Sequence, residues 1–344
     1  MKASYTKYNL NFKRASGTSR GIIKTKETWF LKLEDGGKWG IGECAVFRGL
    51  SYDDKPDYEQ RLHWVCEHIN KGEAWLLQEL KEYPSIQFGI ETAFRSLAGE
   101  TPYYIYNGAF SNGQESIPIN GLIWMGDIGF MTDQIAEKLT SGFTCIKLKI
   151  GALDFDTELK LLEGIRLKYD ASKIILRVDA NGAFAPQEAP QKLAQLAQYN
   201  LHSIEQPIRQ GNIEEMAKLC ATTPLPIALD EELIGITGVT KKRELLQRIQ
   251  PQYIILKPSL VGGFSGSDEW ITLAEENNIG WWITSALESN IGLNAIAQWT
   301  ASLDYQGHQG LGTGGLFTNN VHSPLEVKRG VLQINTKKDW ILNI

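Results

Sequence analysis

A repeat of about 27 residues is the feature that most restricts the fold of this chain. From about residue 117, short apolar runs alternate seven times with longer amphipathic stretches. Stretches such as "DFDTELKLLEGIRLKYD" carry apolar residues at helical spacing, often after an Asp, Ser or Thr that suits an N-cap. The apolar runs are 28, 29, 29, 23, 27 and 27 residues apart and begin at Ile117, Cys145, Ile174, Ser203, Pro226, Tyr253 and Gly280. Seven strand–helix units predict parallel strands joined by right-handed crossovers.

About 200 residues of such units favour an α/β barrel over an open sheet. A last strand is expected near "HQGLGTG", residues 308–314. The alternative is a doubly wound open sheet, but no G-x-G-x-x-G follows the first strand to support it.

The residues on either side of the repeat follow a different pattern. Residues 1–116 contain an expected hairpin, "TWFLKLEDGGKWGIGECAVF", and two helical stretches, so we predict a separate α+β domain. The barrel is assigned to residues 117–316. In residues 317–344, "PLEVKRGVLQINT" indicates another hairpin, which is expected to pack back on the first domain.

Composition excludes several classes of function. The net charge is -5, and no long basic run is present, which argues against a nucleic-acid partner. No window approaches 18 apolar residues, and the first twenty residues lack the apolar core of a signal peptide, so no membrane association is expected. The four cysteines are far apart without a C-x-x-C pair, which indicates reduced thiols and a cytoplasmic protein.

Charged residues stand where successive strands of the repeat should end. From Lys149 onward they are spaced 30, 26, 25 and 27 residues apart, one in each unit. The set consists of Lys147 and Lys149, then Asp179, Glu205, Asp230 and Lys257. In a barrel these positions converge on the mouth formed by the carboxyl ends of the strands, where such enzymes place their chemistry.

Three of these residues predict a metal site. Asp179, Glu205 and Asp230 would repel one another unless a cation lay among them. An all-oxygen ligand set selects a hard ion, so we expect Mg²⁺, for which Mn²⁺ can substitute. The alternative is that each acid pairs with a nearby lysine or arginine in a structural network.

The lysines predict proton transfer. A metal ion and a neighbouring ammonium would lower the pKa of Lys149 and make it a usable general base. Lys257 comes four strands later, roughly across the mouth from Lys149. This arrangement fits removal of a proton α to a carboxylate whose developing charge is stabilised at the metal.

The motifs "KLKIG", "RVDANGAF", "EQPI", "LDEEL" and "KPSLVGG", in this order, resemble the enolase superfamily and its muconate-lactonizing subgroup. The resemblance covers nearly the whole chain. It implies a modified (β/α)8 TIM barrel, (β/α)7β, with an α+β capping domain. It also implies that Asp179, Glu205 and Asp230 are the metal ligands, that Lys149 and Lys257 are the acid/base pair, and that Lys147 tunes Lys149.

Within the subgroup the chain is most similar to the o-succinylbenzoate synthases of menaquinone biosynthesis, through "KPSLVGGFSG" and "TSALESNIGLNAIA". The resemblance implies a lyase that converts 2-succinyl-6-hydroxy-2,4-cyclohexadiene-1-carboxylate to 2-succinylbenzoate. N-acylamino acid racemase and dipeptide epimerase are the alternatives. The dipeptide epimerases usually carry D-x-D where this chain has "SALES", with Glu288 as its single acid. A non-catalytic barrel that binds a carboxylate ligand is a further alternative.

Small and hydroxyl residues near the mouth are candidates for binding the substrate's succinyl chain. They are Ser285, Gly262, Gly263, Gly310 and Gly312. The alternative for the glycines is that they serve only turns. Arg48, in the expected capping loop, either meets a carboxylate or is a solvated surface residue. The sequence leaves open whether the protein is a monomer or a homo-oligomer.

Overall fold

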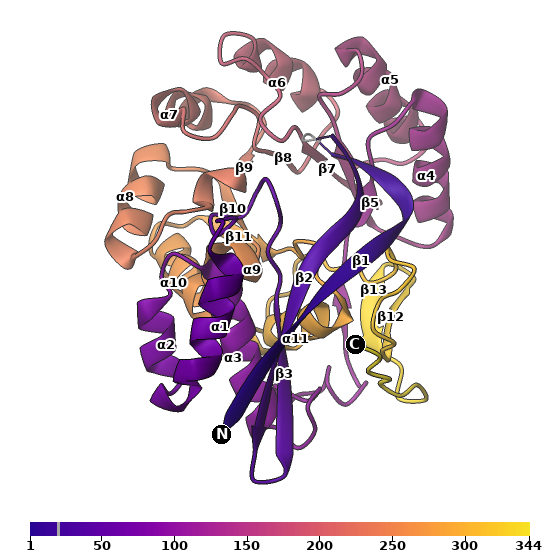
Figure 1. Ribbon diagram of the computed structural model, residues 1–344. Coiled ribbons are helices and arrows are strands. Elements are labelled where there is room, and N and C mark those ends of the chain that lie inside the picture. Colours follow the sequence, from indigo (N-terminus) through magenta and orange to yellow (C-terminus); the bar gives the residue numbers. More distant parts are fainter. Residues whose placement is uncertain (19–20) are drawn as a thin grey trace.

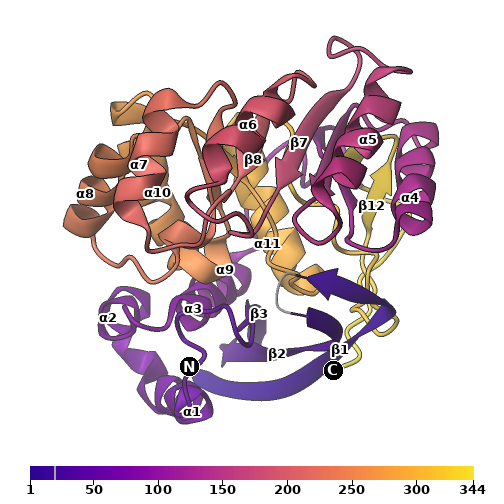
Figure 2. The same ribbon diagram turned by 90° about the horizontal axis from the view of Figure 1, so that it is seen from above.

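The computed structural model describes residues 1–18 and 21–344. An antiparallel sheet with its helices forms one layer, and a barrel of strands surrounded by helices forms the other (Figures 1 and 2). The α/β barrel with a separate α+β domain, predicted from the repeat, is therefore confirmed.

The capping domain begins with three antiparallel strands in the order β1-β2-β3. They are β1 (Lys2–Thr18), β2 (Gly21–Asp35) and β3 (Lys38–Cys44). The predicted hairpin turn is present, because Asp35 pairs with Lys38 and the two glycines between them have positive φ angles. β1 was not predicted, since its residues are mostly polar and several of its side chains face solvent.

Helices of the capping domain cover the sheet and form its hydrophobic core. They are α1 (Tyr58–His68), the short 3-10 helix η1 (Ile69–Lys71), α2 (Glu73–Glu79) and α3 (Pro84–Ala98). α3 approaches β3 so closely that a Cβ on Gly42 would lie 1.9 Å from the carbonyl oxygen of Gly89. Only glycine at this crossing permits the contact that places α3 between the sheet and the barrel.

Seven parallel strands form the barrel sheet, in the order β11-β10-β9-β8-β7-β6-β5. Their bounds are β5 (Gly121–Ile123), β6 (Cys145–Lys149), β7 (Ile175–Asp179), β8 (Ser203–Glu205), β9 (Ile227–Leu229), β10 (Tyr253–Leu256) and β11 (Gly280–Ile283). Six of these seven strands lie within the predicted apolar runs at matching positions, and β5 lies in the second half of the first run.

Helices follow the strands, and most of them lie on the outer side of the sheet (Figure 1). They are α4 (Ile128–Thr140), α5 (Phe155–Arg166), α6 (Ala189–Ala197), α7 (Ile213–Thr222), α8 (Val239–Ile249), α9 (Pro258–Val261), α10 (Gly263–Glu276) and α11 (Asn290–Ser302), with the 3-10 helix η2 (Glu231–Leu233) after β9. Asp154 caps α5 by accepting a hydrogen bond from the Thr157 N–H, as the sequence pattern indicates.

The segment around Gln309 and Gly310 closes the barrel. The N–H of Gln309 donates to the carbonyl of Pro118 at 2.8 Å, beside β5. The N–H of Gly310 donates to the carbonyl of Ile283 at 2.8 Å, in β11. This segment lies in the predicted last strand and makes the closed arrangement (β/α)7β.

The first apolar run of the repeat is divided between two sheets. Its first half is β4 (Ser116–Pro118), which pairs with the C-terminal hairpin of β12 (Leu325–Lys328) and β13 (Val331–Ile334). The tail also reaches the capping domain, where the Thr318 N–H donates to the Asn11 carbonyl and Trp340 stacks on Tyr103. The tail therefore contacts both layers, and the borders at residues 116 and 316 stay a prediction.

Two further properties concern the described part of the chain. None of its helices is both long and apolar enough to span a membrane. All four cysteines are free thiols, and only Cys66 is partly exposed.

Candidate active site at the carboxyl ends of the barrel strands

The charged residues predicted from the repeat lie at the carboxyl ends of consecutive strands. Lys149, Asp179 and Glu205 are the last residues of β6, β7 and β8, and the strand register places Lys149 beside Asp179 and Asp179 beside Glu205. Asp230 directly follows β9 and Lys257 directly follows β10. The three acids therefore lie on the three strands between the two lysine-bearing strands, and the barrel brings these residues together.

Ion pairs join the lysines to the acids inside the mouth. Lys147 donates to Glu205 at 2.7 Å and to Asp179 at 3.2 Å. Lys149 pairs with Asp179 on one side of the site, and Lys257 pairs with Asp230 on the other. Because the acids are at most 3 % exposed, these charges interact with little screening by solvent.

The close spacing of the acids perturbs their protonation. Burial, the neighbouring Asp179 and then Asp230 raise the pKa of Glu205 to about 8, although Lys147 opposes this. Burial also disfavours the charged form of Asp179, but Lys149 and Lys147 outweigh it and hold the pKa of that carboxyl well below its usual range. For Lys257, the carboxylates of Asp230, Glu205 and Glu231 outweigh burial and raise the pKa.

The same acids are candidates for holding a metal ion. Across the described residues, no group of three or more His, Cys, Asp or Glu side chains is gathered around one point as a metal would require. The acids instead bind the lysine ammonium groups, and Oε1 of Glu205 is buried without a hydrogen-bond partner in the described part of the chain. An all-carboxylate set with an unsatisfied buried oxygen fits a hard divalent cation such as Mg²⁺ by its chemistry.

Two residues with positive φ angles hold the loops above the acids. Asn181 (φ 45°) accepts a hydrogen bond from Lys149 at 2.9 Å and donates to Glu231 at 2.9 Å. Gln206 (φ 41°) accepts from the backbone N–H of Asp230 at 3.2 Å and donates to Glu232 at 3.1 Å. A positive φ in glutamine costs about 1 kcal/mol or more, so the surrounding contacts must maintain it.

Sequence reasoning did not find the role of Gln206, because nothing in the sequence marks a glutamine that adopts this backbone conformation. The signal that exists is its position directly after Glu205, at a strand end that already carries a candidate ligand.

Ser285 belongs to a buried hydroxyl and carboxylate network beside the mouth. Its hydroxyl donates to Glu288 at 2.5 Å and accepts from Thr313 at 2.8 Å, while the hydroxyl of Ser259 donates to the other oxygen of Glu288. The Glu288 side chain is fully buried. This network joins the loops that follow β10, β11 and the closing strand.

Close neighbours or the backbone conformation explain why glycine occupies the four candidate positions. A Cβ on Gly310 would lie 2.5 Å from the hydroxyl of Thr284, and a Cβ on Gly263 would lie 2.2 Å from the carboxylate of Glu91. A Cβ on Gly312 would lie 3.3 Å from the Cδ1 atom of Ile119, and Gly262 has a φ of 100°. Their role in substrate binding stays a prediction.

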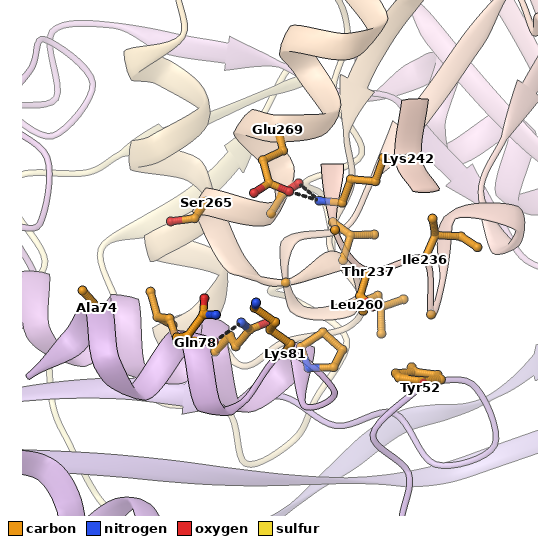
Figure 3. A pocket seen from close by; sticks show the side chains of 18 residues that line it. Tyr52, Ala74, Gln78, Lys81, Ile236, Thr237, Lys242, Leu260, Ser265 and Glu269 are labelled. Carbon is orange, nitrogen blue, oxygen red and sulfur yellow. Dashed lines mark hydrogen bonds and ion pairs between the residues drawn. The ribbon is translucent and has the colours of Figure 1, made fainter. Parts of the chain in front are cut away.

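A cavity of about 210 Å³ lies between the capping domain and the barrel (Figure 3). Ala74, Gln78 and Lys81 line it from the α2 side, and Lys242 and Glu269, which form an ion pair, line it from the barrel. None of the six charged strand-end residues lines this cavity, although Gly262 does. The cavity is therefore separate from the cluster of lysines and acids.

Arg48 lies in the loop between β3 and α1 and forms ion pairs with Glu27 and Asp54. These contacts account for its charge and hold the capping loop against β2. The side chain is 42 % exposed, as expected for a surface arginine.

Two family profiles match the chain. The family described as "Enolase C-terminal domain-like" matches residues 131–338, and the family described as "MenC, N-terminal domain" matches residues 2–97. Together they cover most of the barrel and most of the capping domain.

Known proteins with related sequences and structures point in the same direction. The chain is 45 % identical to the o-succinylbenzoate synthase of Desulfotalea psychrophila, over 97 % of this chain and 99 % of that one. The crystal structure of MenC from Desulfotalea psychrophila matches with a TM-score of 0.87 at 43 % identity, over 97 % and 99 % of the two chains. The chain is also 29 % identical to the L-Ala-D/L-Glu epimerase of Bacillus subtilis, over 83 % and 80 % of the two chains.

Proposed function

Because the chain belongs to the enolase superfamily, and within it to the family of o-succinylbenzoate synthases, we propose that it is a lyase which forms 2-succinylbenzoate. Its substrate is 2-succinyl-6-hydroxy-2,4-cyclohexadiene-1-carboxylate, from which it removes water. The observation that supports this best is the position of Lys149 and Lys257 on opposite sides of three buried acids.

Lys149 is the general base of the proposed reaction. Its neutral amine takes the proton from the ring carbon that bears the carboxylate, and the electron pair of the C–H bond moves into that carboxylate to form an enediolate. The electron pair then returns, the bond between the ring and its hydroxyl breaks, and the protonated Lys149 donates its proton to the leaving hydroxide. Water is released and the ring becomes aromatic, so one lysine serves both steps on the same face of the ring.

Lys257 stays protonated and places its charge over the ring. Its raised pKa, caused by the surrounding carboxylates, supports this role. A fixed positive charge stabilises the enediolate without transferring a proton. The side-chain oxygen of Asn181 accepts a hydrogen bond from Lys149. This contact keeps the amine in the mouth of the barrel.

Asp179, Glu205 and Asp230 are the proposed ligands of Mg²⁺, with Mn²⁺ as a substitute. When bound, the cation would supply a positive charge for the carboxylate of the substrate. The support is their all-oxygen chemistry, their burial and the raised pKa of Glu205.

Glu288 argues against a dipeptide substrate. An epimerase for dipeptides needs free carboxylates for the substrate's ammonium, but both oxygens of Glu288 already accept hydrogen bonds from serine hydroxyls. N-acylamino acid racemisation remains the second candidate, because it would use the same two lysines, one on each face.

We place the protein in menaquinone biosynthesis and in the cytoplasm. The four free cysteines support a reducing compartment. Ser285, whose buried hydroxyl lies at the mouth, is the proposed contact for the succinyl chain together with backbone near the glycines.

Loss of the diene absorbance of the substrate tests the proposal. Turnover should require Mg²⁺, stop with EDTA and be lost in Lys149→Ala, whereas Lys160→Ala on the exposed face of α5 should react like the wild type. Turnover that survives both EDTA and Lys149→Ala would exclude this mechanism. N-succinylphenylalanine, followed by circular dichroism, tests racemisation in the same preparation.

A further inference from the structure

Lys26 is a buried lysine outside the proposed catalytic set. Its side chain, in β2 of the capping domain, is only 5 % exposed. Its ammonium group has no hydrogen-bond partner among the described residues. Burial lowers the pKa of Lys26, and the nearby carboxylates only partly offset this. An unpaired ammonium in the interior destabilises a fold, so a reason for its presence must lie elsewhere.

Lys26 lies where the capping sheet covers the mouth of the barrel. In the sheet register it faces Leu10 of β1. Leu10 packs in one cluster with Leu287 of the loop after β11, and Trp124, which directly follows β5, packs against this cluster. Those two loops follow the first and last strands of the barrel sheet. Lys26 therefore lies above the place where the closing segment joins β5 to β11.

The acids near Lys26 are satisfied without it. Glu43 accepts hydrogen bonds from Thr28, from Ser289 and from the N–H of Gly292, all of them neutral donors. Glu288 accepts from two serine hydroxyls. Both acids are close enough to influence the charge of Lys26, but neither forms an ion pair with it. The ammonium therefore has no direct anionic partner among the described residues.

Four other cations among the described residues of this region already have partners. Lys147, Lys149 and Lys257 bind the acids at the strand ends, and Arg48 binds Glu27 and Asp54. The proposed substrate has two carboxylates, one at the reacting ring carbon and one at the end of the succinyl chain. The second carboxylate needs its own cation, at a distance from the acids.

We propose that Lys26 binds the carboxylate at the end of the substrate's succinyl chain and so selects dicarboxylate substrates. This inference rests on the proposed function of the site. Lys26 positions the substrate and determines substrate specificity, and it takes no part in proton transfer. The capping domain thereby contributes a charged residue to recognition of the substrate, whereas the barrel carries the chemistry.

The rival explanation is structural. Lys26 would then stabilise the negative charges of Glu43 and Glu288 without forming a direct ion pair with either. The two explanations differ in their effect on stability. Replacing a counter-charge would destabilise the fold, whereas replacing an unpaired buried ammonium by an apolar side chain of similar length would leave stability unchanged or increase it.

The test uses Lys26→Met and the full-length protein with Mg²⁺. Titration calorimetry compares binding of 2-succinylbenzoate with binding of its methyl ester at the succinyl carboxylate. The wild type should bind the free acid about tenfold or more tightly than the ester, and Lys26→Met should lose this preference. In turnover, KM of Lys26→Met should rise by a similar factor while kcat changes little. Lys32→Met, which removes an exposed lysine from the same strand, should match the wild type.

Each outcome is decisive for Lys26. A variant that keeps the preference for the free acid and an unchanged KM would overturn the proposal. A variant with a lower melting temperature and an unchanged preference would assign Lys26 the structural role instead. If the wild type neither turns over the diene nor binds 2-succinylbenzoate, the proposed function itself fails, and this result is separate from any effect of Lys26→Met.

Discussion

Glu43, in β3 of the capping domain, accepts hydrogen bonds from both the backbone N–H and the hydroxyl of Ser289 at the start of α11 in the barrel. A second buried acid repeats this arrangement, since Glu91 of α3 binds the N–H groups of Phe264 and Ser265 near the start of α10. Carboxylates at helix N-termini satisfy free N–H groups and complement the helix dipole. The two domains are therefore joined through the ends of two barrel helices, next to the mouth.

Glu91→Ala should destabilise the protein by about 1–3 kcal/mol, because it leaves the buried N–H of Phe264 and the N–H of Ser265 without their acceptor. Glu91→Gln should lose less, since its amide oxygen still accepts. Urea unfolding measures the difference, with Glu79→Ala on the exposed side of α2 as the control. Equal stability of Glu91→Ala and the wild type would show that Glu91 does not stabilise the domain contact.

Asp53→Asn should remove a pH dependence from stability. Burial raises the pKa of Asp53 to about 6, although Ser85 donates two hydrogen bonds to it. Because the folded state binds this proton more tightly, the stabilisation is present at low pH and is lost as the pH rises through about 6. Between pH 4 and pH 7, the free energy of unfolding of the variant should therefore rise by roughly 3 kcal/mol relative to that of the wild type.

Asp54→Asn is the matched control for Asp53. Burial opposes ionisation of Asp54, but the N–H of Gly49 and the guanidinium of Arg48 outweigh it and lower the pKa. Asp54 thus stabilises the fold above its ordinary pKa, and this contribution is lost as the pH falls. Denaturation curves at several pH values should show opposite trends for the two variants, and parallel trends would contradict the assignment.

Mg²⁺ should raise the melting temperature of the wild type, because a ligand that binds only the folded state stabilises it by about 2.7 kcal/mol at a hundred times its Kd. Glu205→Gln should abolish most of this rise while melting no lower than the wild type without metal, because burial and two neighbouring acids already favour the uncharged form of Glu205. Thermal melts with Mg²⁺ or EDTA provide the measurement. A full Mg²⁺ response in Glu205→Gln would remove Glu205 from the ligand set.

Arginine substitutions should distinguish the role of Lys149 from that of Lys257. Lys149→Arg should be as inactive as Lys149→Ala, with kcat lowered by about 10²–10⁴, because a guanidinium does not act as a base at neutral pH. Lys257→Arg should retain more activity than Lys257→Ala, because it keeps the positive charge. Steady-state kinetics with the diene substrate decide this, and an active Lys149→Arg would contradict the assignment of the base.

The repeat predicted the barrel well because each unit carries its own hydrophobic pattern and its own polar strand end. The residues from Lys149 to Lys257 could be aligned by counting, since parallel strands with similar helices bring equivalent positions to one level. β1 escaped detection because Leu10 is the one buried residue among positions 2–14 of this mostly polar strand. The division of the run at Ile117 depends on pairing of β4 with β13, which lies more than 200 residues away and leaves no local signal.

The candidate site was predictable in its charges and not in its supporting contacts. Glu91 and Glu43 are single acids within ordinary helix and strand patterns, and their roles arise only when another domain supplies free N–H groups. Lys26 is similar, because an alternating strand gives no indication of what lies opposite its buried face. Such residues depend on the relative position of two domains, which hydrophobic periodicity does not encode.

The short closing strand at Gln309 and Gly310 has a consequence for the synthesis of the protein. During translation, every residue proposed for catalysis leaves the ribosome before the segment that seals β5 to β11. Until then both edges of the parallel sheet expose unpaired backbone groups, which favour aggregation between chains. The nascent protein is therefore most vulnerable late in its synthesis, and a chaperone that shields sheet edges would benefit it at that stage.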